Sequence, residues 1–160
     1  MNVQATLPPL TEAQAKAAID SCTCFHFRRV SRLLTSMYDH YLSPAGVRSG
    51  QLVLLLTIKT AGSATRNRLA EMVDLDQSAL SRGLQALERQ NLIQSVAGDD
   101  RRTRIVTLTD LGEAKILEAV PFWERAQRAA EEAIGADATP RMLAELDRVR
   151  ERIQPELSKA

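Results

Sequence analysis

The chain has 160 residues, 44% of them hydrophobic and 26% charged, and its 21 Lys and Arg against 20 Asp and Glu give a formal net charge of +1. This composition excludes a disordered chain, and the length suits one domain or an elongated chain that completes its core in a dimer. No apolar run approaches the ~18 residues that a membrane span needs, and the N-terminus lacks the charged and apolar segments of a secretory signal. We therefore expect a cytoplasmic protein.

The N-terminal part of the chain predicts one long helix. Thr11 suits the N-cap of a helix that begins at Glu12, and apolar residues recur at helical spacing from there to about Leu42. A helix of about 30 residues is too long to be covered wholly by its own small domain. The segment Ser43-Pro44-Ala45-Gly46 is expected to end it.

The next segments predict a buried helix followed by a helix-turn-helix. Residues 51–60 are apolar nearly all round, which is typical of a central helix. Thr65 is a suitable N-cap for a short helix over residues 66–73. Asp74-Leu75 then forms a turn, and a second helix follows over residues 76–90 with Asp76 as its cap.

After Asn91 the hydrophobic pattern changes to that of a β-hairpin. The hydrophobic pattern in residues 92–96 and 104–108 predicts two strands. The segment between them is polar and charged and contains a glycine. An antiparallel hairpin with a basic tip directly after a helix-turn-helix is the wing of a winged helix.

Two more helices complete the prediction. One begins at Thr109 and runs to about Ile134, where Gly135 stops it, and Pro121 should kink it. The last begins with Thr139 as N-cap and runs to about residue 154.

The second helix of this pair carries side chains suited to contact the bases and phosphates of DNA. The side chains that its apolar face leaves free are short hydroxyls, amides and one guanidinium, where a helix designed only for solubility would carry more Lys and Glu. Arg pairs bidentately with guanine and Gln with adenine, each worth about 1–3 kcal/mol of discrimination, and Ser suits phosphate contacts. The alternative is a polar face turned to water.

The hairpin tip carries the sequence Asp100-Arg101-Arg102, followed by Arg104. The Asp carboxylate can orient one of the guanidinium groups, and an arginine presented in this way fits the minor groove of DNA, where negative potential is concentrated. All seven basic residues of the segment 65–104 are arginines, which bind phosphates and base edges better than lysines. The alternative is a charged turn that keeps the hairpin soluble.

These motifs resemble the MarR (multiple antibiotic resistance regulator) family. The residues that carry the resemblance are Leu69-Ala70-Glu71, residues 76–82, Leu84, residues 87–90, 100–102 and 108–112. The resemblance implies a homodimeric, mostly repressing, ligand-responsive transcription factor on palindromic DNA. It also implies a mainly α fold: a winged helix-turn-helix with a two-stranded β wing and with long N- and C-terminal dimerisation helices.

The resemblance divides the chain into an N-terminal dimerisation helix (residues 1–48), a DNA-binding lobe (49–108) and C-terminal dimerisation helices (109–160). The wing Asp and Arg of the family fall on Asp100 and Arg102. The expected DNA-contacting residues are Thr65, Gln77, Ser78, Ser81, Arg82, Gln85, Asp100, Arg101, Arg102 and Arg104. A dimer of this kind predicts an inverted repeat of roughly 16–20 bp with half-sites about 10 bp apart.

The two cysteines form a Cys-x-Cys pair in the first predicted helix. On a helix their side chains diverge by about 200°, so they neither chelate one ion nor bond to each other. Cys22 lies on the apolar stripe and is expected to be an inert core thiol. Cys24-Phe25, with Tyr38 fourteen residues later, resembles the MarR-type organic hydroperoxide sensors, whose reactive cysteine is hydrogen-bonded by tyrosines. The alternative for Cys24 is a passive thiol.

The resemblance otherwise implies a small aromatic carboxylate or phenol as effector, bound between the dimer helices and the DNA-binding lobe. An arginine can bind a carboxylate bidentately, and histidine titrates near physiological pH. The candidate residues are His26, Arg29, Tyr38, His40, Arg48 and Trp123. Each also has an ordinary structural alternative, in the core for the Tyr and Trp and at the surface for the arginines.

Two hypotheses from other functional classes remain open. One is a thiol peroxidase built on Cys24, and the other is a winged helix that binds protein rather than DNA. The sequence has no Gly-rich phosphate loop, no metal-ligand constellation and no evident nucleophile–base pair. We therefore expect no enzyme, no cofactor and no metal.

Overall fold

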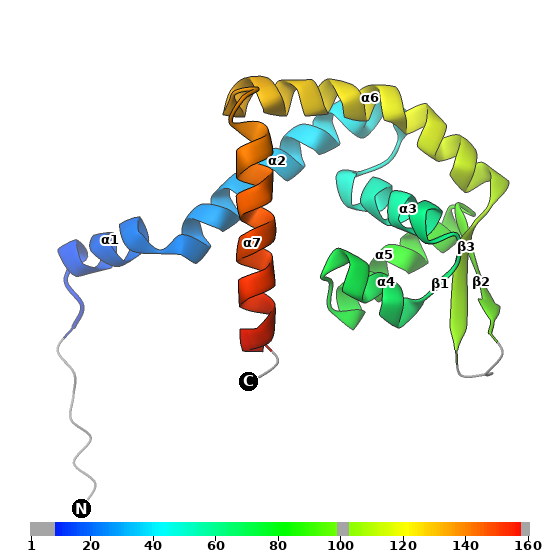
Figure 1. The fold of residues 1–160 in the computed structure, drawn as a ribbon, viewed down its shortest axis with the longest axis horizontal. Coiled ribbons are helices and arrows are strands. Elements are labelled where there is room, and N and C mark those ends of the chain that lie inside the picture. Colours follow the sequence, from blue (N-terminus) through cyan, green and yellow to red (C-terminus); the bar gives the residue numbers. More distant parts are fainter. Residues whose placement is uncertain (1–8, 99–102, 158–160) are drawn as a thin grey trace, which may run out of the picture. The chain divides into compact units, whose positions relative to one another are not determined.

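The computed structural model describes residues 9–98 and 103–157. The chain divides into two compact units, Met1–Ser36 and Met37–Ala160. The elements in chain order (Figure 1) are α1 (Glu12–Ser21), α2 (Thr23–Leu42), the 3-10 helix η1 (Ser43–Ala45), α3 (Ser49–Ala61), β1 (Ala64–Thr65), α4 (Arg66–Val73), α5 (Gln77–Arg89), β2 (Ile93–Ala97), β3 (Arg104–Leu108), α6 (Asp110–Ile134) and α7 (Thr139–Leu157). The fold is mainly α, as expected.

The N-terminal unit contains two helices where the sequence predicted one. Thr11 caps α1 as predicted, and Gln14 completes a capping box with it. The helix then breaks at Cys22, where ψ is 103°, and the Cys22 N–H bonds to the Ile19 carbonyl. The preceding Ser21 hydroxyl donates to the Ala17 carbonyl, and such side-chain bonds compete with the regular helix ladder.

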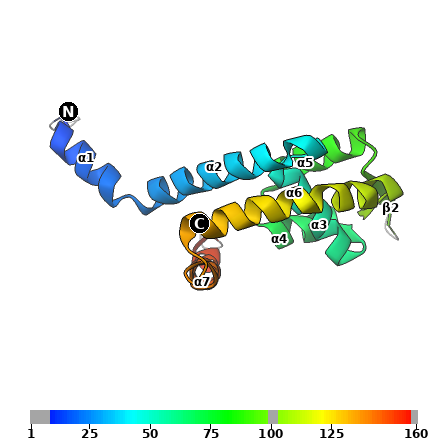
Figure 2. The ribbon, with the colours of Figure 1, turned by 90° about the horizontal axis from the view of Figure 1, so that it is seen from above.

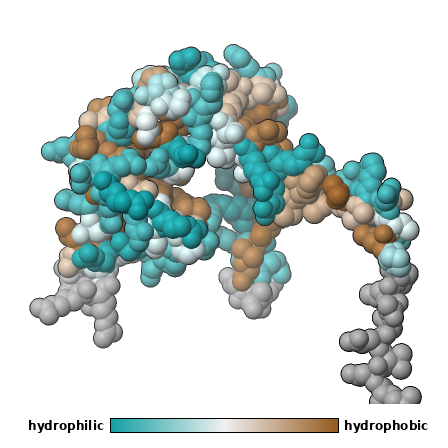
Figure 3. All heavy atoms as spheres, turned by 180° about the vertical axis from the view of Figure 1, so that it is seen from behind, coloured by the Kyte–Doolittle hydropathy of each residue, from teal (hydrophilic) through white to brown (hydrophobic). Residues whose placement is uncertain are grey.

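The residues of this unit lie largely at the surface. Cys22 and Cys24 are free and exposed, so the expectation of a core thiol at Cys22 is wrong for this chain. Large apolar side chains are exposed as well, and Figure 3 shows hydrophobic residues on the outside of these helices. They are Ile19, Phe25, Phe27, Val30 and Leu33.

Helix α3 is the centre of the second unit, as its apolar sequence predicted. Leu54, Leu55 and Ile58 are buried in the main core cluster, and only Val53 of its apolar run is mostly exposed, at 51%. Its other end packs through Leu52 in a smaller cluster that includes Ala119 of α6. The core of the second unit therefore lies on both sides of α3.

The helix-turn-helix has the predicted boundaries because its caps form as expected. The Thr65 hydroxyl accepts from the Arg68 N–H at 3.2 Å and begins α4. Asp74 ends α4 in the left-handed conformation (φ 50°), and the Asp76 carboxylate accepts from the Ala79 N–H at 2.7 Å to begin α5. Gly83 of α5 packs so closely on α3 that a Cβ there would lie 2.6 Å from Cδ1 of Leu54.

The sheet has three strands where the sequence predicted two. Strands β2 and β3 pair antiparallel as the predicted wing, with Ile93 opposite Leu108. The two-residue strand β1 adds to the other edge of β3, with Thr65 opposite Ile105, which gives the order β1-β3-β2. This short strand is too brief to show an alternating pattern in the sequence.

Helix α6 begins after its N-cap Thr109 and ends at Gly135 (φ 99°), as predicted. It continues through Pro121, and Figure 2 shows it from above as one helix. Gly112 in its first turn packs on the backbone of Leu92.

Helix α7 runs to Leu157, a few residues beyond the predicted end. Thr139 is its first helical residue rather than its N-cap, and the Thr139 hydroxyl donates to the Gly135 carbonyl at 3.0 Å. Within the described ranges, no helix combines the length and the apolar character needed to cross a membrane.

Candidate nucleic-acid interface

Helix α5 has one face in the core and the opposite face in contact with solvent. Its apolar side packs into the main core cluster through Leu80, Leu84 and Leu87, which are fully buried. The polar side is outward, as predicted: Ser81 is half-buried, and the other candidate residues of the helix are exposed, namely Gln77, Ser78, Arg82 and Gln85. The helix therefore presents hydroxyl, amide and guanidinium groups on one open surface.

A chain of hydrogen bonds orders the first turn of this surface. Arg82 Nη1 donates to the Ser78 hydroxyl at 3.3 Å, and that hydroxyl donates to the Asp76 carboxylate at 2.7 Å. The Ser78 hydroxyl and the Ala79 amide favour the ionised carboxylate, and with a smaller contribution from Arg82 they hold the pKa of Asp76 below its ordinary value. The guanidinium of Arg82 is thus oriented along the exposed face of the helix.

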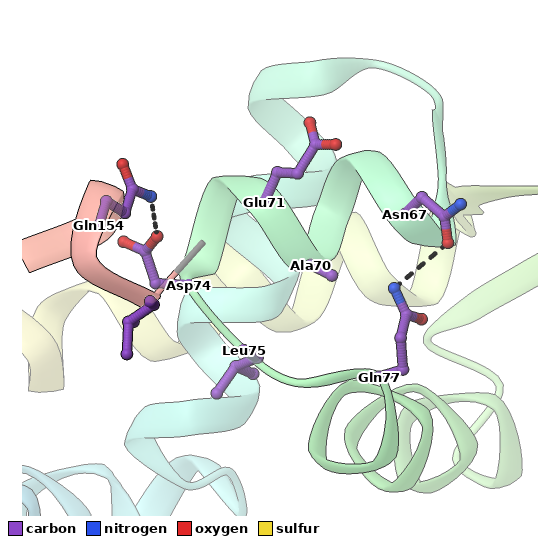
Figure 4. A pocket seen from close by; sticks show the side chains of 8 residues that line it. Asn67, Ala70, Glu71, Asp74, Leu75, Gln77 and Gln154 are labelled. Carbon is purple, nitrogen blue, oxygen red and sulfur yellow. Dashed lines mark hydrogen bonds between the residues drawn. The ribbon is translucent and has the colours of Figure 1, made fainter. Parts of the chain in front are cut away.

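The start of α5 is also tied to the first turn of α4. Gln77 Nε2 donates to Asn67 Oδ1 at 3.2 Å, as the close-up in Figure 4 shows. This bond joins residues ten positions apart, and no motif in the sequence pointed to Asn67. The amide pair fixes the spacing of the two helices where both expose polar groups.

A cavity of about 340 Å³ lies where helix α4, helix α5 and strand β3 meet. It brings together four predicted residues that are distant in the sequence: Thr65, Gln77, Ser81 and Arg104. It also includes three residues that the sequence reasoning missed: Arg66, Asn67 and Thr103. Only the arginine-rich composition of the segment pointed toward Arg66.

The wing is described only in its two strands. Arg104 is exposed at the start of β3 and pairs in register with Ala97. The other three wing residues predicted to contact DNA lie outside the described residues: Asp100, Arg101 and Arg102.

The effector candidates fall in both units. In the N-terminal unit, His26 Nε2 lies 3.0 Å from the Asp20 carbonyl oxygen, and the Arg29 guanidinium lies 5.4 Å from the centre of the Phe25 ring. The redox candidate Cys24 is an exposed free thiol in the same unit.

In the second unit, the Tyr38 hydroxyl donates to Gln127 Oε1 at 2.6 Å. Burial, together with the charge of Glu131, raises the pKa of Tyr38 above its ordinary value. The other three candidates of this unit are exposed: His40, Arg48 and Trp123. Within the described ranges, no group of three or more His, Cys, Asp or Glu residues is arranged to hold a metal ion.

Comparison with known proteins identifies this arrangement. The MarR family model matches residues 47–103, which run from just before α3 to the wing. The crystal structure of the transcriptional regulator MosR from M. tuberculosis in complex with DNA is 30% identical, with a TM-score of 0.73, and the alignment covers 84% of this chain and 99% of that one. The chain belongs to the MarR family.

Two further proteins are similar to this chain, one in fold and one in sequence. The transcriptional repressor CouR bound to a 23-mer DNA duplex has a TM-score of 0.75 at 21% identity, with 83% of this chain and 95% of that chain covered. An HTH-type transcriptional regulator of Bacillus cereus (strain ZK / E33L) is 32% identical over 93 residues, which is 58% of this chain and 62% of that protein. The match thus spans less than two thirds of this curated relative. The segment that carries the family match contains α5 and every residue that lines the cavity beside it except Arg104.

Proposed function

We propose that the protein regulates transcription by binding palindromic double-stranded DNA as a homodimer, with residues 76–90 in the major groove and the wing, residues 97–104, in the minor groove. The observation that carries this proposal is the two-sided character of α5, whose leucines are buried while its polar face is open. The DNA complexes of MosR and CouR, which have this fold, support it.

The chemistry of the open face suits a duplex groove. Arg82 is held by Ser78 near the start of the helix, the part of a recognition helix that approaches base edges. A guanidinium there can bond bidentately to guanine, and Gln85, one turn further on, can pair with adenine. Ser81 is short enough to allow a close approach to the DNA backbone.

Exposed apolar side chains outside the DNA-binding lobe favour a homodimer. Helix α7 exposes Leu143, Leu146, Ile153 and Leu157, and the N-terminal helices expose a similar set. Helices that leave large apolar side chains in water need a partner. A second copy related by two-fold symmetry would cover residues 1–48 and 109–160 and leave residues 49–108 for DNA. The same symmetry makes the operator an inverted repeat of roughly 16–20 bp.

The regulatory part of the proposal is repression that a small aromatic effector releases. Such a molecule must bind the two states of the dimer with different affinity in order to shift them. Trp123 is the single tryptophan and is partly exposed on α6, so quenching of its fluorescence by added aromatic acids measures binding. A second candidate is sensing of organic hydroperoxides, which the exposed free thiol of Cys24 favours.

Selection of duplexes from a random library, followed by footprinting of the best binder, tests the proposal. We expect protection of two half-sites about 10 bp apart and an affinity that falls steeply between about 50 and about 200 mM salt. Failure to enrich any duplex, or protection of a single half-site, would contradict it. Binding that stays flat as salt rises would favour a protein-binding winged helix.

A further inference from the structure

The cavity between α4, α5 and β3 is built by a strand pairing that the sequence did not reveal. Strand β1 places Thr65 opposite Ile105 on β3. Arg66, which follows Thr65 and begins α4, and Arg104, which precedes Ile105 on β3, both line the cavity. Two cationic side chains from segments about 40 positions apart therefore border one hollow on the same side as the polar face of α5.

In this structure the guanidinium of Arg66 makes only a long contact with a carboxylate, that of Glu88. Its Nη2 lies 3.6 Å from Oε1 of Glu88, which is longer than a hydrogen bond. Its Nε is buried and has no hydrogen-bond partner among the residues that the structure describes. Glu88 is also engaged elsewhere, because the Ser95 hydroxyl donates to it. The guanidinium of Arg66 thus keeps donor capacity at the edge of the cavity.

We propose that this cavity binds a phosphodiester group of the DNA backbone, with Arg66 as the principal ligand and Glu88 as the competing anion that holds Arg66 when DNA is absent. The inference rests on the proposed DNA binding and adds a site to it. A guanidinium binds two phosphate oxygens in parallel, which matches the geometry of the ligand better than a single carboxylate oxygen at 3.6 Å.

The other walls of the cavity complete a site for an oxyanion. The hydroxyl of Ser81 and the amide groups of Asn67 and Gln77 are neutral donors. Thr65, Arg66 and Asn67 bring the start of α4, the positive end of the helix dipole, to the edge of the cavity. Arg104 adds a second cation from β3.

Methylphosphonate substitution of the selected duplex tests this site. Each phosphate in turn is replaced by its neutral analogue, and fluorescence anisotropy measures the affinity. We expect one position in each half-site where the wild-type protein loses about tenfold in affinity and where the Arg66→Ala variant, already about tenfold weaker, loses nothing further. Loss of two phosphate contacts per dimer should also reduce the slope of log affinity against log salt by about 1.8.

Two variants separate the site from general electrostatics. Arg68→Ala removes a cation from the same helix, but Arg68 pairs with Glu71 and does not line the cavity, so its affinity should stay within about twofold of wild type. Glu88→Gln keeps a hydrogen-bond acceptor for Ser95 but removes the competing charge. We expect it to raise affinity for specific and unrelated duplexes alike by about threefold, since phosphate contacts carry no sequence information.

The possible results decide between the site and its alternatives. If Arg66→Ala and Arg68→Ala behave alike, or if every methylphosphonate affects Arg66→Ala as it affects wild type, the site is wrong although DNA binding stands. If inorganic phosphate, at ionic strength matched with chloride, binds to wild type but not to Arg66→Ala and leaves the affinity for DNA unchanged, the cavity belongs to a free anion and the proposal is overturned. If wild type binds no duplex at all, the proposed function itself fails.

Discussion

Arg150 of α7 forms an ion pair with Asp74, and 3.3 Å separates Nη1 of the arginine from Oδ2 of the carboxylate. Gln154, one turn further along α7, donates from Nε2 to the other oxygen of the same carboxylate at 2.8 Å (Figure 4). Asp74 ends α4 in the left-handed conformation, at the turn of the helix-turn-helix. The last helix of the chain therefore touches the turn that sets the direction of α5.

This contact should contribute little to stability, because both partners are well exposed, at 51% for Arg150 and 38% for Asp74. A double-mutant cycle with Asp74→Asn and Arg150→Ala should give a coupling free energy of about 0.2–1 kcal/mol. Urea denaturation measures it, and Asn is chosen because it tolerates the left-handed conformation. A coupling above about 2 kcal/mol would show that the pair is desolvated, contrary to the exposure of both side chains.

Gly112 should be intolerant of a side chain. A Cβ on this residue would lie 2.0 Å from the carbonyl oxygen of Leu92, and backbone cannot yield as a side chain can. Gly112→Ala should lower the free energy of unfolding by about 3 kcal/mol or more. Gly50→Ala in α3 is the matched control, since nothing lies within 4 Å of a Cβ there, and it should be neutral or stabilising. Equal unfolding midpoints for the two variants would refute this packing.

The cap of α5 predicts a pH dependence. The folded protein holds the pKa of Asp76 below the ordinary value of 3.8. As the pH falls, the Asp76 carboxylate is therefore protonated at a higher pH in the unfolded chain than in the folded protein. The contribution of Asp76 to stability is therefore complete above the ordinary value and is lost as the pH falls through the folded pKa. Thermal denaturation from neutral to acidic pH measures it.

Asp76→Asn is the informative variant for this cap. An asparagine keeps a capping oxygen but has no charge to titrate, so the acid-side loss of stability should be smaller than in wild type. A profile for Asp76→Asn that is parallel to the wild-type profile would mean that other carboxylates account for the acid sensitivity.

Arg82 should determine base preference. Arg82→Ala is expected to weaken binding to the selected duplex by roughly 10- to 100-fold, the value of one bidentate base contact, and to leave binding to unrelated duplexes nearly unchanged. Arg89→Ala, an exposed arginine in the last turn of the same helix, is the control and should retain the preference. Arg102→Ala in the wing should instead weaken binding to all duplexes. Unchanged affinity for both Arg82→Ala and Arg102→Ala would exclude the assigned DNA-binding face.

The sequence predicted those parts of the fold that local chemistry determines. The first residues of α4, α5 and α6 could be predicted from their N-caps. These are Thr65, Asp76 and Thr109, and the side chain of each accepts a hydrogen bond from the first turn of its helix. The polar face of α5 was equally visible, because helical periodicity alone separates it from the buried leucines.

Features that depend on distant partners were not predictable in this way. Strand β1 exists because Ala64 meets Val106 across the sheet, and a two-residue strand leaves no pattern of its own. Arg66 was missed for the same reason, since only that pairing brings it near Arg104. The exposure of Cys22 was not predictable for the same reason, because it depends on what packs against the N-terminal helices: α1 has no buried residue, and Cys24 inside α2 is exposed as well.

Dimethyl sulfate footprinting on the selected duplex tests the central claim most directly, because this reagent attacks guanine N7 in the major groove. With wild-type protein we expect protection of guanines in both half-sites, and with Arg82→Ala we expect at least one guanine in each half-site to become reactive again while its neighbours stay protected. A duplex that is fully bound by wild-type protein and yet methylated at every guanine would contradict the placement of α5 in the groove.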